Sequence, residues 1–180
     1  DSSDVSVDVL EVMSDGRTLI AGQFDRIGSF VRRGLARLNA DGTMDTSFTT
    51  SVEGTIHAIT ELSNGKIMLG GEFTSINNTA RTNIVRLNAN GSIDNSFNAT
   101  TSDVVRLLFE RQNGKLLIGG NFTQVNSEDT SHLAQLLDSG ALDSTFAAPY
   151  VGARSSPSQN DGVYAVAEIQ AELQSNNQLV

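Results

Sequence analysis

The sequence contains no cysteine, which excludes a disulfide framework and any metal site built on thiolate ligands. No apolar run reaches the length of about 18 residues that a membrane-spanning helix needs, and the first residues lack the pattern of a signal peptide. Basic residues are also few, because 12 Lys and Arg stand against 21 Asp and Glu, for a formal net charge of −9. Such a chain repels phosphate backbones, so we expect no nucleic-acid binding. From the lack of a long apolar run we expect no membrane insertion.

What the sequence does contain is an internal repeat of 49 residues. Seven positions are identical in three consecutive copies without a gap. They are Gly16/Gly65/Gly114, Gly22/Gly71/Gly120, Phe24/Phe73/Phe122, Leu38/Leu87/Leu136, Gly42/Gly91/Gly140, Asp45/Asp94/Asp143 and Phe48/Phe97/Phe146. Seven matching columns at one spacing establish three structurally equivalent units.

The second copy predicts a small antiparallel sheet. Two apolar-rich segments, 55–62 and 66–73, flank Asn64-Gly65, which predicts a β-hairpin with a type I′ turn. A third strand is expected near 83–88, followed by a second tight turn and a short fourth strand at 92–97. The segment 66–73 is apolar on both faces, which is typical of a strand covered on both sides.

These units predict an all-β fold built of β-propeller blades. One small sheet cannot bury both of its faces, and radial stacking of four-stranded blades covers them, whereas linear stacking would give a solenoid. Gly70-Gly71 is expected to mark a β-bulge or a close approach between blades. Phe73 and Phe97 are expected to pack between blades.

The repeats divide the chain into five segments. We assign repeat 1 to residues 5–54, repeat 2 to 55–103, repeat 3 to 104–148, an inserted loop to 149–162 and a truncated repeat 4 to 163–180. This gives about three and a half blades, whereas closed propellers have about four to eight. We therefore expect the chain to be a segment of a longer protein or, alternatively, two copies to complete one ring.

The repeat resembles the delta-60 repeat family of propeller-like repeats. The stretches that carry the resemblance are 58–73 and 86–97 in copy two, 17–24 and 37–48 in copy one, and 113–122 in copy three. Copy three departs from the pattern at 135–140, where Arg, Asn and Ala are lost. The resemblance implies a propeller in an extracellular or virion setting, in a bacterial surface, secreted or phage-associated protein. It implies no catalytic residue.

The turns after the third strands offer a candidate calcium site. Oxygen-bearing side chains recur around a glycine, as Ca²⁺ requires; they are Asn39, Asp41, Asp45, Asn88, Asn90 and Asp94. Copy three has Leu137 and Ser139 in place of two of these ligands. Asx-type turns, in which Asp or Asn accepts hydrogen bonds from nearby backbone N–H groups, explain the same pattern. We expect no other metal and no cofactor.

The connection between the second and third strands differs in every copy except for one apolar position, Ile27, Ile76 or Val125. Equivalent loops share one side of a propeller, and loops on a rigid scaffold commonly carry recognition. The candidate binding residues on this loop face are Phe30, Arg32, Arg33, Asn77, Asn78, Arg81, Asn126 and Glu128.

No catalytic constellation is evident, since His57 and His132 occupy different repeat columns and lack partners at matching spacing. We therefore expect a non-enzymatic module for structural assembly or for recognition of a cell-surface glycan or protein. It would belong to a larger extracellular or virion protein. The alternatives are a propeller-scaffold hydrolase or lyase acting on a polysaccharide, and a purely architectural spacer.

Overall fold

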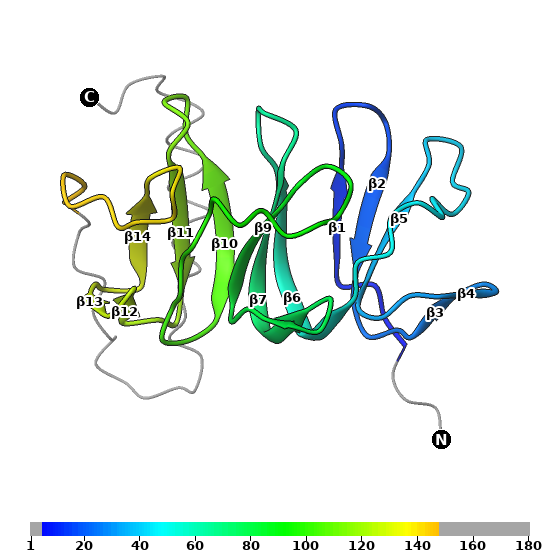
Figure 1. Cartoon of the computed structure of the whole chain (residues 1–180), viewed down its shortest axis with the longest axis horizontal. Coiled ribbons are helices and arrows are strands. Elements are labelled where there is room, and N and C mark those ends of the chain that lie inside the picture. The colour runs from blue at the N-terminus through cyan, green and yellow to red at the C-terminus, as the bar shows by residue number, and fades with distance from the viewer. Residues whose placement is uncertain (1–4, 148–180) are drawn as a thin grey trace, which may run out of the picture.

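The computed structural model describes residues 5–147, which contain the three regular repeats. The expected inserted loop at 149–162 and the truncated repeat at 163–180 lie outside the described residues. Within residues 5–147 the fold is all-β, without a helix, and the strands pair antiparallel. Three sheets follow one another along the long axis of the molecule (Figure 1). The all-β prediction is confirmed, and no helix of the described part could cross a membrane.

Each repeat forms one sheet, here called a blade. Blade 1 consists of β1 (Val9–Val12), β2 (Thr18–Ala21) and β5 (Leu35–Leu38). Blade 2 consists of β6 (Val52–Glu61), β7 (Ile67–Ile76) and β9 (Ile84–Leu87). Blade 3 consists of β10 (Val105–Glu110), β11 (Leu116–Gly120) and β14 (Leu133–Leu136). In every blade the second strand lies between the first and the third.

A short hairpin strand or strand pair is added at one edge of each blade. These additions are β3 (Arg26–Ile27) with β4 (Phe30–Val31), β8 (Thr79–Ala80) with the end of β7, and β12 (Gln124–Val125) with β13 (Glu128–Asp129). The expected fourth strand at 92–97 does not form, because the segment makes only the single bridge Leu87↔Ile93. The fourth strand of blade 2 is β8 instead.

The turn between the first two strands differs in type from the predicted one. Gly65 N donates to Leu62 O at 2.8 Å, and φ is +76° at Gly65 but not positive at Asn64. This is a type I turn followed by a left-handed glycine, not a type I′ turn, which requires positive φ at both central residues. Two consecutive positive φ values occur elsewhere, at Asn77 and Asn78 (50° and 59°), in the hairpin that joins β7 to β8.

The paired glycines serve both of the expected purposes. The register of β6 on β7 shifts between Ile56 and Ala58, opposite Gly71 and Gly70, so His57 is the extra residue of a β-bulge. A Cβ on Gly71 would overlap the backbone of Thr55, and a Cβ on Gly70 would come within 2.8 Å of the Val105 side chain in blade 3. The glycines therefore permit the bulge and the close approach of the next blade.

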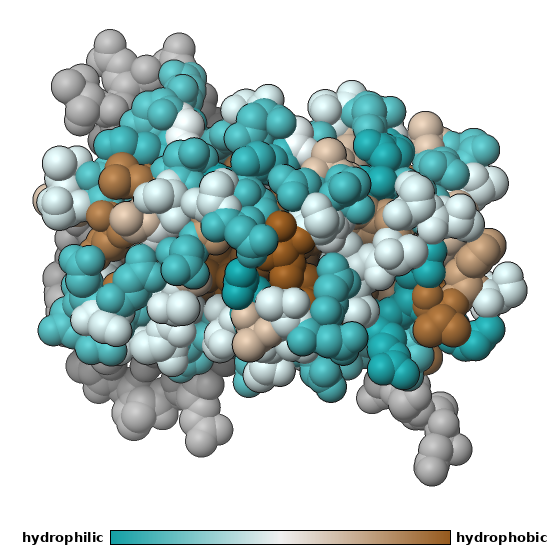
Figure 2. Space-filling view, viewed as in Figure 1, coloured by the Kyte–Doolittle hydropathy of each residue, from teal (hydrophilic) through white to brown (hydrophobic). Residues whose placement is uncertain are grey.

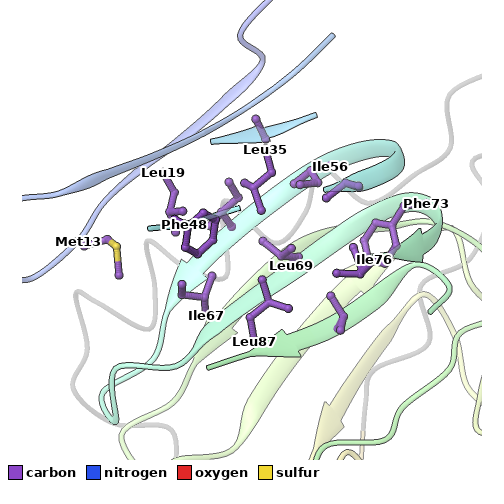
Figure 3. Close-up of a cluster of buried hydrophobic side chains, with 14 residues drawn as sticks. Met13, Leu19, Leu35, Phe48, Ile56, Ile67, Leu69, Phe73, Ile76 and Leu87 are labelled. Atoms are coloured by element: carbon purple, nitrogen blue, oxygen red, sulfur yellow. The ribbon is translucent and has the colours of Figure 1, made fainter. Parts of the chain in front are cut away.

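The core lies between the blades. β1 contacts β6, and β6 contacts β10, so the first strands of successive blades lie against one another. Figure 3 shows the first interface, where Leu19, Leu35 and Phe48 of blade 1 meet Ile56 and Phe73 of blade 2. Phe97 occupies the corresponding place in the cluster between blades 2 and 3. The expected inter-blade packing of Phe73 and Phe97 is confirmed.

Candidate functional site

The hairpins at the ends of the second strands lie along one edge of the molecule, at the bottom of Figure 1, and this edge is here called the loop edge. The shared apolar position anchors them, since Ile76 and Val125 are fully buried and Ile27 is half-buried. The residues around this position are mostly exposed. In Figure 2 apolar colour appears over the hairpin β3–β4, where Phe30 and Val31 are exposed.

Two of the predicted binding residues act as clamps between blades. Asn77 Oδ1 accepts a hydrogen bond from Ser51 N at 2.9 Å, and Asn126 Oδ1 accepts one from Thr100 N at 2.9 Å. Ser51 and Thr100 lie in the segments that connect one blade to the next. The αL conformation of the two asparagines (φ 50° and 51°) aims their side chains at these segments. Asn77 and Asn126 are therefore occupied within the fold.

Two predicted arginines are also engaged by their own blades. Arg32 Nη1 donates to Val31 O at 2.8 Å, and Arg81 Nη1 donates to Ala80 O at 2.9 Å. The second nitrogen of each guanidinium reaches the turn after the third strand, through Thr46 O and Asn95 Oδ1 respectively. Glu128 is exposed on β13 of blade 3.

The loop edge holds an open cleft of about 940 Å³ between blades 1 and 2. Arg33 and Asn78, both predicted binding residues, line it. Its polar lining also includes Gln23, Asp25, Arg26, Ser51, Glu53 and Ser75, and Phe24, Gly22, Gly34 and Gly54 contribute to its walls. Arg33 and Asp25 form a long ion pair of 3.9 Å, with side chains 71% and 86% exposed. Their charges are thus available to a bound molecule.

The repeats differ at one position beside the cleft, where blade 1 has a glycine. Gly34, Asn83 and His132 occupy one column, and all three have positive φ between 63° and 69°. Asn83 is buried, and its Nδ2 donates to Thr101 O at 3.3 Å, which ties blade 2 to the segment leading into blade 3. Gly34 has no side chain to make the corresponding tie between blades 1 and 2. Gly34 is one of the residues that line the cleft.

Sequence reasoning found Arg33 and Asn78 but missed Glu53 and Ser75 as cleft residues. Asp25 and Arg26 lie in the loop that differs between the repeats. The divergence of this loop could have identified them as cleft residues. Glu53 belongs to the long strand β6 and comes from the next blade. No spacing in the sequence indicates that Glu53 and the loop of blade 1 meet in one cleft.

The predicted calcium ligands are engaged in turns and ion pairs. In the first turn, Asp41 Oδ1 accepts hydrogen bonds from Thr43 N and Oγ1 at 2.9 and 2.6 Å, and Asn39 Nδ2 donates to Thr43 Oγ1 at 3.0 Å. Asn88 and Asn90 make the corresponding contacts with Ser92. These are the Asx-type turns that explained the same pattern. Residues 5–147 contain no group of three or more His, Cys, Asp or Glu side chains arranged to hold a metal ion. Calcium binding at these turns stays a candidate that a titration must test.

The invariant aspartates hold a buried cation cluster. In blade 2, Asp94 Oδ2 accepts from Arg86 Nε at 2.6 Å and from Lys66 Nζ at 2.8 Å, while Asp94 Oδ1 accepts from Ser96 N at 3.0 Å. The Arg86 guanidinium also lies 5.0 Å from the centroid of the Phe97 ring. Asp45 takes the same role in blade 1, with Arg37 Nε at 2.8 Å.

These contacts keep the carboxyl groups ionised. Burial by itself raises the pKa of Asp45, but hydrogen bonds from Ser47 and Arg37 outweigh it and lower the pKa to about 2. In Asp94 burial also opposes ionisation, and hydrogen bonds from Lys66 and Ser96 outweigh it and lower the pKa of this carboxyl group. The hydrogen bond from Lys115 is the main cause of the lowered pKa of Asp143.

Each of the first two arginines extends into the next blade. Arg37 Nη1 donates to Ala89 O, and Arg86 Nη1 donates to Asp138 Oδ1, both at 2.5 Å. In blade 3 this column holds Gln135, whose Nε2 donates to Asp143 at 2.6 Å. Arg111 occupies the repeat position at which blades 1 and 2 have the buried Met13 and Leu62. Its guanidinium lies 5.8 Å from the centroid of the Phe146 ring. A different residue thus supplies the cation in blade 3.

The two histidines lie in different blades. His57 is the bulge residue of β6, and His132 precedes β14 with φ +63°. Burial and the positive charge of Arg106 lower the pKa of His57, while Glu72 and Asp8 partly oppose that shift. His132 Nδ1 is buried without a hydrogen-bond partner in the described structure.

A family model described as a domain of unknown function (DUF5122) β-propeller matches residues 14–48, 62–97 and 111–146, more than half of the chain. Each matched segment runs from the turn after the first strand of a blade to the phenylalanine after its third strand. Neither the curated proteins nor the solved structures include a significant match. The finer resemblance to delta-60 repeats stays a prediction. The chain belongs to the DUF5122 β-propeller family.

Proposed function

We propose that this chain is a non-enzymatic propeller module that recognises a surface ligand through the cleft between blades 1 and 2. The observation that carries the proposal is the cleft itself, because it lies on the loop edge and most of its lining residues differ between the repeats. Loops on a rigid scaffold are the usual place for recognition. The setting would be a larger extracellular or virion protein, such as a tail or fibre. The remainder of a longer chain or a second copy would complete the propeller.

The chemistry of the cleft suits a polar ligand such as a cell-surface glycan. Arg33 and Arg26 offer N–H donors, Glu53 offers acceptors, and the Asn78 amide offers both. Hydroxyl groups of a sugar can bond to all of these. The buried Phe24 and the glycines of the walls bring apolar surface and backbone groups to the same place. A protein loop with polar side chains is the second ligand class that this lining accommodates.

A glycan array and cell-binding measurements test the proposal with matched variants. Arg33→Ala and Asn78→Gly remove exposed cleft side chains without straining the backbone, so both variants should fold normally and lose at least about tenfold in affinity. Ser127→Gly is the control, since Ser127 occupies the repeat position of Asn78 but lies in blade 3, away from the cleft. Equal binding by all three variants contradicts recognition at the cleft. An absence of any ligand favours the architectural spacer.

One observation favours a second candidate, a hydrolase or lyase acting on a polysaccharide. Asp25 of blade 1 and Glu53 of blade 2 both line the cleft, and paired carboxyl groups are the usual catalytic groups of glycoside hydrolysis. Incubation with polysaccharides and analysis of product size distinguishes the two functions. Cleavage that Asp25→Asn and Glu53→Gln abolish would establish the enzyme, whereas binding without cleavage supports recognition.

A further inference from the structure

One position of the repeat carries a different ionisable side chain in each blade. Asp8, His57 and Arg106 follow one another at the spacing of 49 residues. His57 is the extra residue of the bulge in blade 2. The register of β10 on β11 shifts between Val105 and Leu107, so Arg106 is the extra residue in blade 3. The bulge position therefore presents an acid, an imidazole and a guanidinium at equivalent places.

The same backbone geometry recurs at this position in all three blades. A Cβ on the invariant glycine beside the bulge would overlap the backbone two residues before the bulge position, which pairs Gly22 with Ser6, Gly71 with Thr55 and Gly120 with Val104. A bulge re-aims the side chain that it inserts, and bulges are frequent beside functional sites for this reason. The preceding residues Ile56 and Val105 are buried between blades, so the polar character is confined to the inserted residue.

The three side chains are neighbours across the blade interfaces. β6 contacts both β1 and β10, so His57 has Asp8 on one side and Arg106 on the other. The charges of Asp8 and Arg106 both act on the His57 imidazole, as does the charge of Glu72 in its own blade. Acid, imidazole and cation thus form one electrostatically connected group that spans three blades.

A second polar position runs beside the first, and it consists of Gln23, Glu72 and Asn121. Arg106 Nε donates to Asn121 Oδ1 at 3.4 Å. Gln23 Nε2 donates to Thr55 Oγ1 at 3.2 Å, a contact that crosses from blade 1 to blade 2. The two positions together are here called the bulge row, and its residues are Asp8, Gln23, His57, Glu72, Arg106 and Asn121.

Much of the hydrogen-bonding capacity of the bulge row is unused within residues 5–147. There the side chains of Asp8, His57 and Glu72 make no hydrogen bond or ion pair, and Arg106 has only its one long hydrogen bond. Arg86, by contrast, is bonded through all three nitrogens. A guanidinium has five N–H donors, and its partial burial without a counter-ion is unfavourable. The row therefore offers charged groups that a ligand can bind.

The charges along the row indicate the class of ligand. Arg106 offers a fork of N–H donors that fits a carboxylate. The carboxylates of Glu72 and Asp8 accept hydrogen bonds and suit hydroxyl groups, and the His57 imidazole between them can donate and accept. Packed sheets lie about 10 Å apart, a span that the long Arg106 side chain and one sugar ring can bridge. A sugar acid has its carboxylate and its hydroxyl groups on one such molecule.

We propose that the bulge row binds a sugar acid, whose carboxylate pairs with Arg106 and whose hydroxyl groups bond to Glu72 and Asp8. The bulge row is distinct from the cleft between blades 1 and 2, because Gln23 is the one residue of the row that lines this cleft. The proposal therefore goes beyond recognition at the cleft and does not depend on it.

Proton NMR of the full chain detects this binding directly. The sequence has two histidines, so His57→Asn identifies the imidazole signal of His57. Titration with glucuronate should shift this signal saturably. Glucose lacks the carboxylate and acetate lacks the hydroxyl groups, so each should bind at least about tenfold more weakly. A His57 signal that glucuronate does not shift, or that glucose or acetate shifts with equal affinity, overturns the proposal.

Substitutions in the row test the placement of the ligand. Arg106→Gln should raise the Kd for glucuronate by at least about tenfold, and Arg106→Lys should raise it less, because a cation remains. Glu72→Gln should raise the Kd about fivefold. Asp129→Asn is the control, since it removes an exposed carboxylate on β13, off the row, and should leave the Kd unchanged. All four variants should melt like the parent chain. Equal affinity of Arg106→Gln and the parent chain contradicts the proposal.

Binding should also be linked to protonation of His57. Burial and the charge of Arg106 lower the pKa of His57, while Glu72 and Asp8 oppose that shift. A bound carboxylate adds a negative charge beside the imidazole and should raise this pKa. Because the coupling is reciprocal, affinity should rise as the pH falls from about 8 to about 5, and His57→Asn should lack this dependence. A pKa of His57 that glucuronate leaves unchanged contradicts the placement. Arg106→Gln should bind a ligand of the cleft like the parent chain, which separates the two sites.

Discussion

Arg111 donates a hydrogen bond from Nη1 to Gln135 Oε1 at 2.6 Å. In blades 1 and 2 the residue equivalent to Gln135 is an arginine that binds the invariant aspartate and lies over a phenylalanine ring. In blade 3 the two contacts are shared between two residues, since Gln135 binds Asp143 and Arg111 lies over Phe146. The cation is thus retained although its column changes.

The first prediction concerns this exchange. Arg111→Met introduces the residue that blade 1 has at this repeat position, Met13. It should lower the free energy of unfolding by about 1–2 kcal/mol, because a hydrogen bond and a cation–π contact are lost. Gln135→Arg should restore most of the loss in the double variant. Urea denaturation of the four chains in a double-mutant cycle measures the coupling. Additive effects of the two substitutions would show that they act independently.

The second prediction is a dependence of stability on acid. The pKa of Asp45 falls from 3.8 to about 2 on folding, so its stabilising contribution is complete above pH 4 and is lost as the pH falls towards 2. The pKa values of Asp94 and Asp143 are also lowered, which extends the loss in the same direction. The free energy of unfolding, measured by denaturation between pH 7 and pH 2, should decline less steeply for Asp45→Asn. This variant lacks about 2 kcal/mol of the contribution at neutral pH. A parallel decline in parent and variant contradicts the assignment.

The third prediction separates two kinds of glycine. Gly71→Ala should destabilise blade 2 by about 3 kcal/mol or more, because the methyl group overlaps the backbone of Thr55 in the bulge. Gly114→Ala should cost only about 1 kcal/mol, since its φ is +74° but a Cβ meets nothing within 4 Å. Thermal melting compares them directly. Equal losses would mean that backbone conformation alone selects both glycines.

The fourth prediction concerns the Asn77 clamp. Asn77→Gly preserves the positive φ and removes the hydrogen bonds to Ser51 N and Gly91 O, so the loss of stability should be about 1–2 kcal/mol. Asn78→Gly is the control, because Asn78 has a similar φ and its side chain is exposed in the cleft. Protease sensitivity near residue 51 should rise only in the first variant. If both variants behave alike, the clamp contributes little.

The fifth prediction applies to calcium. The carboxylates of Asp45 and Asp94 are paired with arginine and hydrogen-bonded in their turns, so added Ca²⁺ must displace those contacts. We therefore expect no heat in a calorimetric titration and no change of melting temperature with a chelator. A saturable heat would establish the calcium site.

The repeat made the blades predictable because identical columns reflect constraints that act within each unit. The glycine at the bulge and the phenylalanine between blades recur wherever a blade meets its neighbour, so self-comparison of one sequence reveals them. The hairpin at Asn77-Asn78 was not predicted, because its second strand, β8, has only two residues and the segment 74–82 is mostly polar and gives no alternation of apolar residues. The turn at Gly65 was assigned the wrong type because Asn-Gly suits both kinds of turn.

The cleft could not be predicted, because it depends on contacts between different columns of neighbouring units. Glu53 belongs to the first strand of blade 2, while Asp25 follows the second strand of blade 1. Their proximity follows from the way one blade lies on the next. The relocation of the cation to Arg111 is of the same kind, since a reader of the sequence sees a missing arginine at Gln135 and an unrelated one 24 residues earlier.

The arginines that reach forward give the array a direction. Arg37 and Arg86 each neutralise an aspartate in their own blade through Nε and hold the following blade through Nη1. Loss of the later blade leaves a guanidinium short of a partner, and loss of the earlier blade leaves its acceptor short of a donor. Because the coupling is reciprocal, unfolding of one blade should destabilise the neighbour on either side of it. Blade 3, with glutamine at this column, contributes no such link from its own third strand.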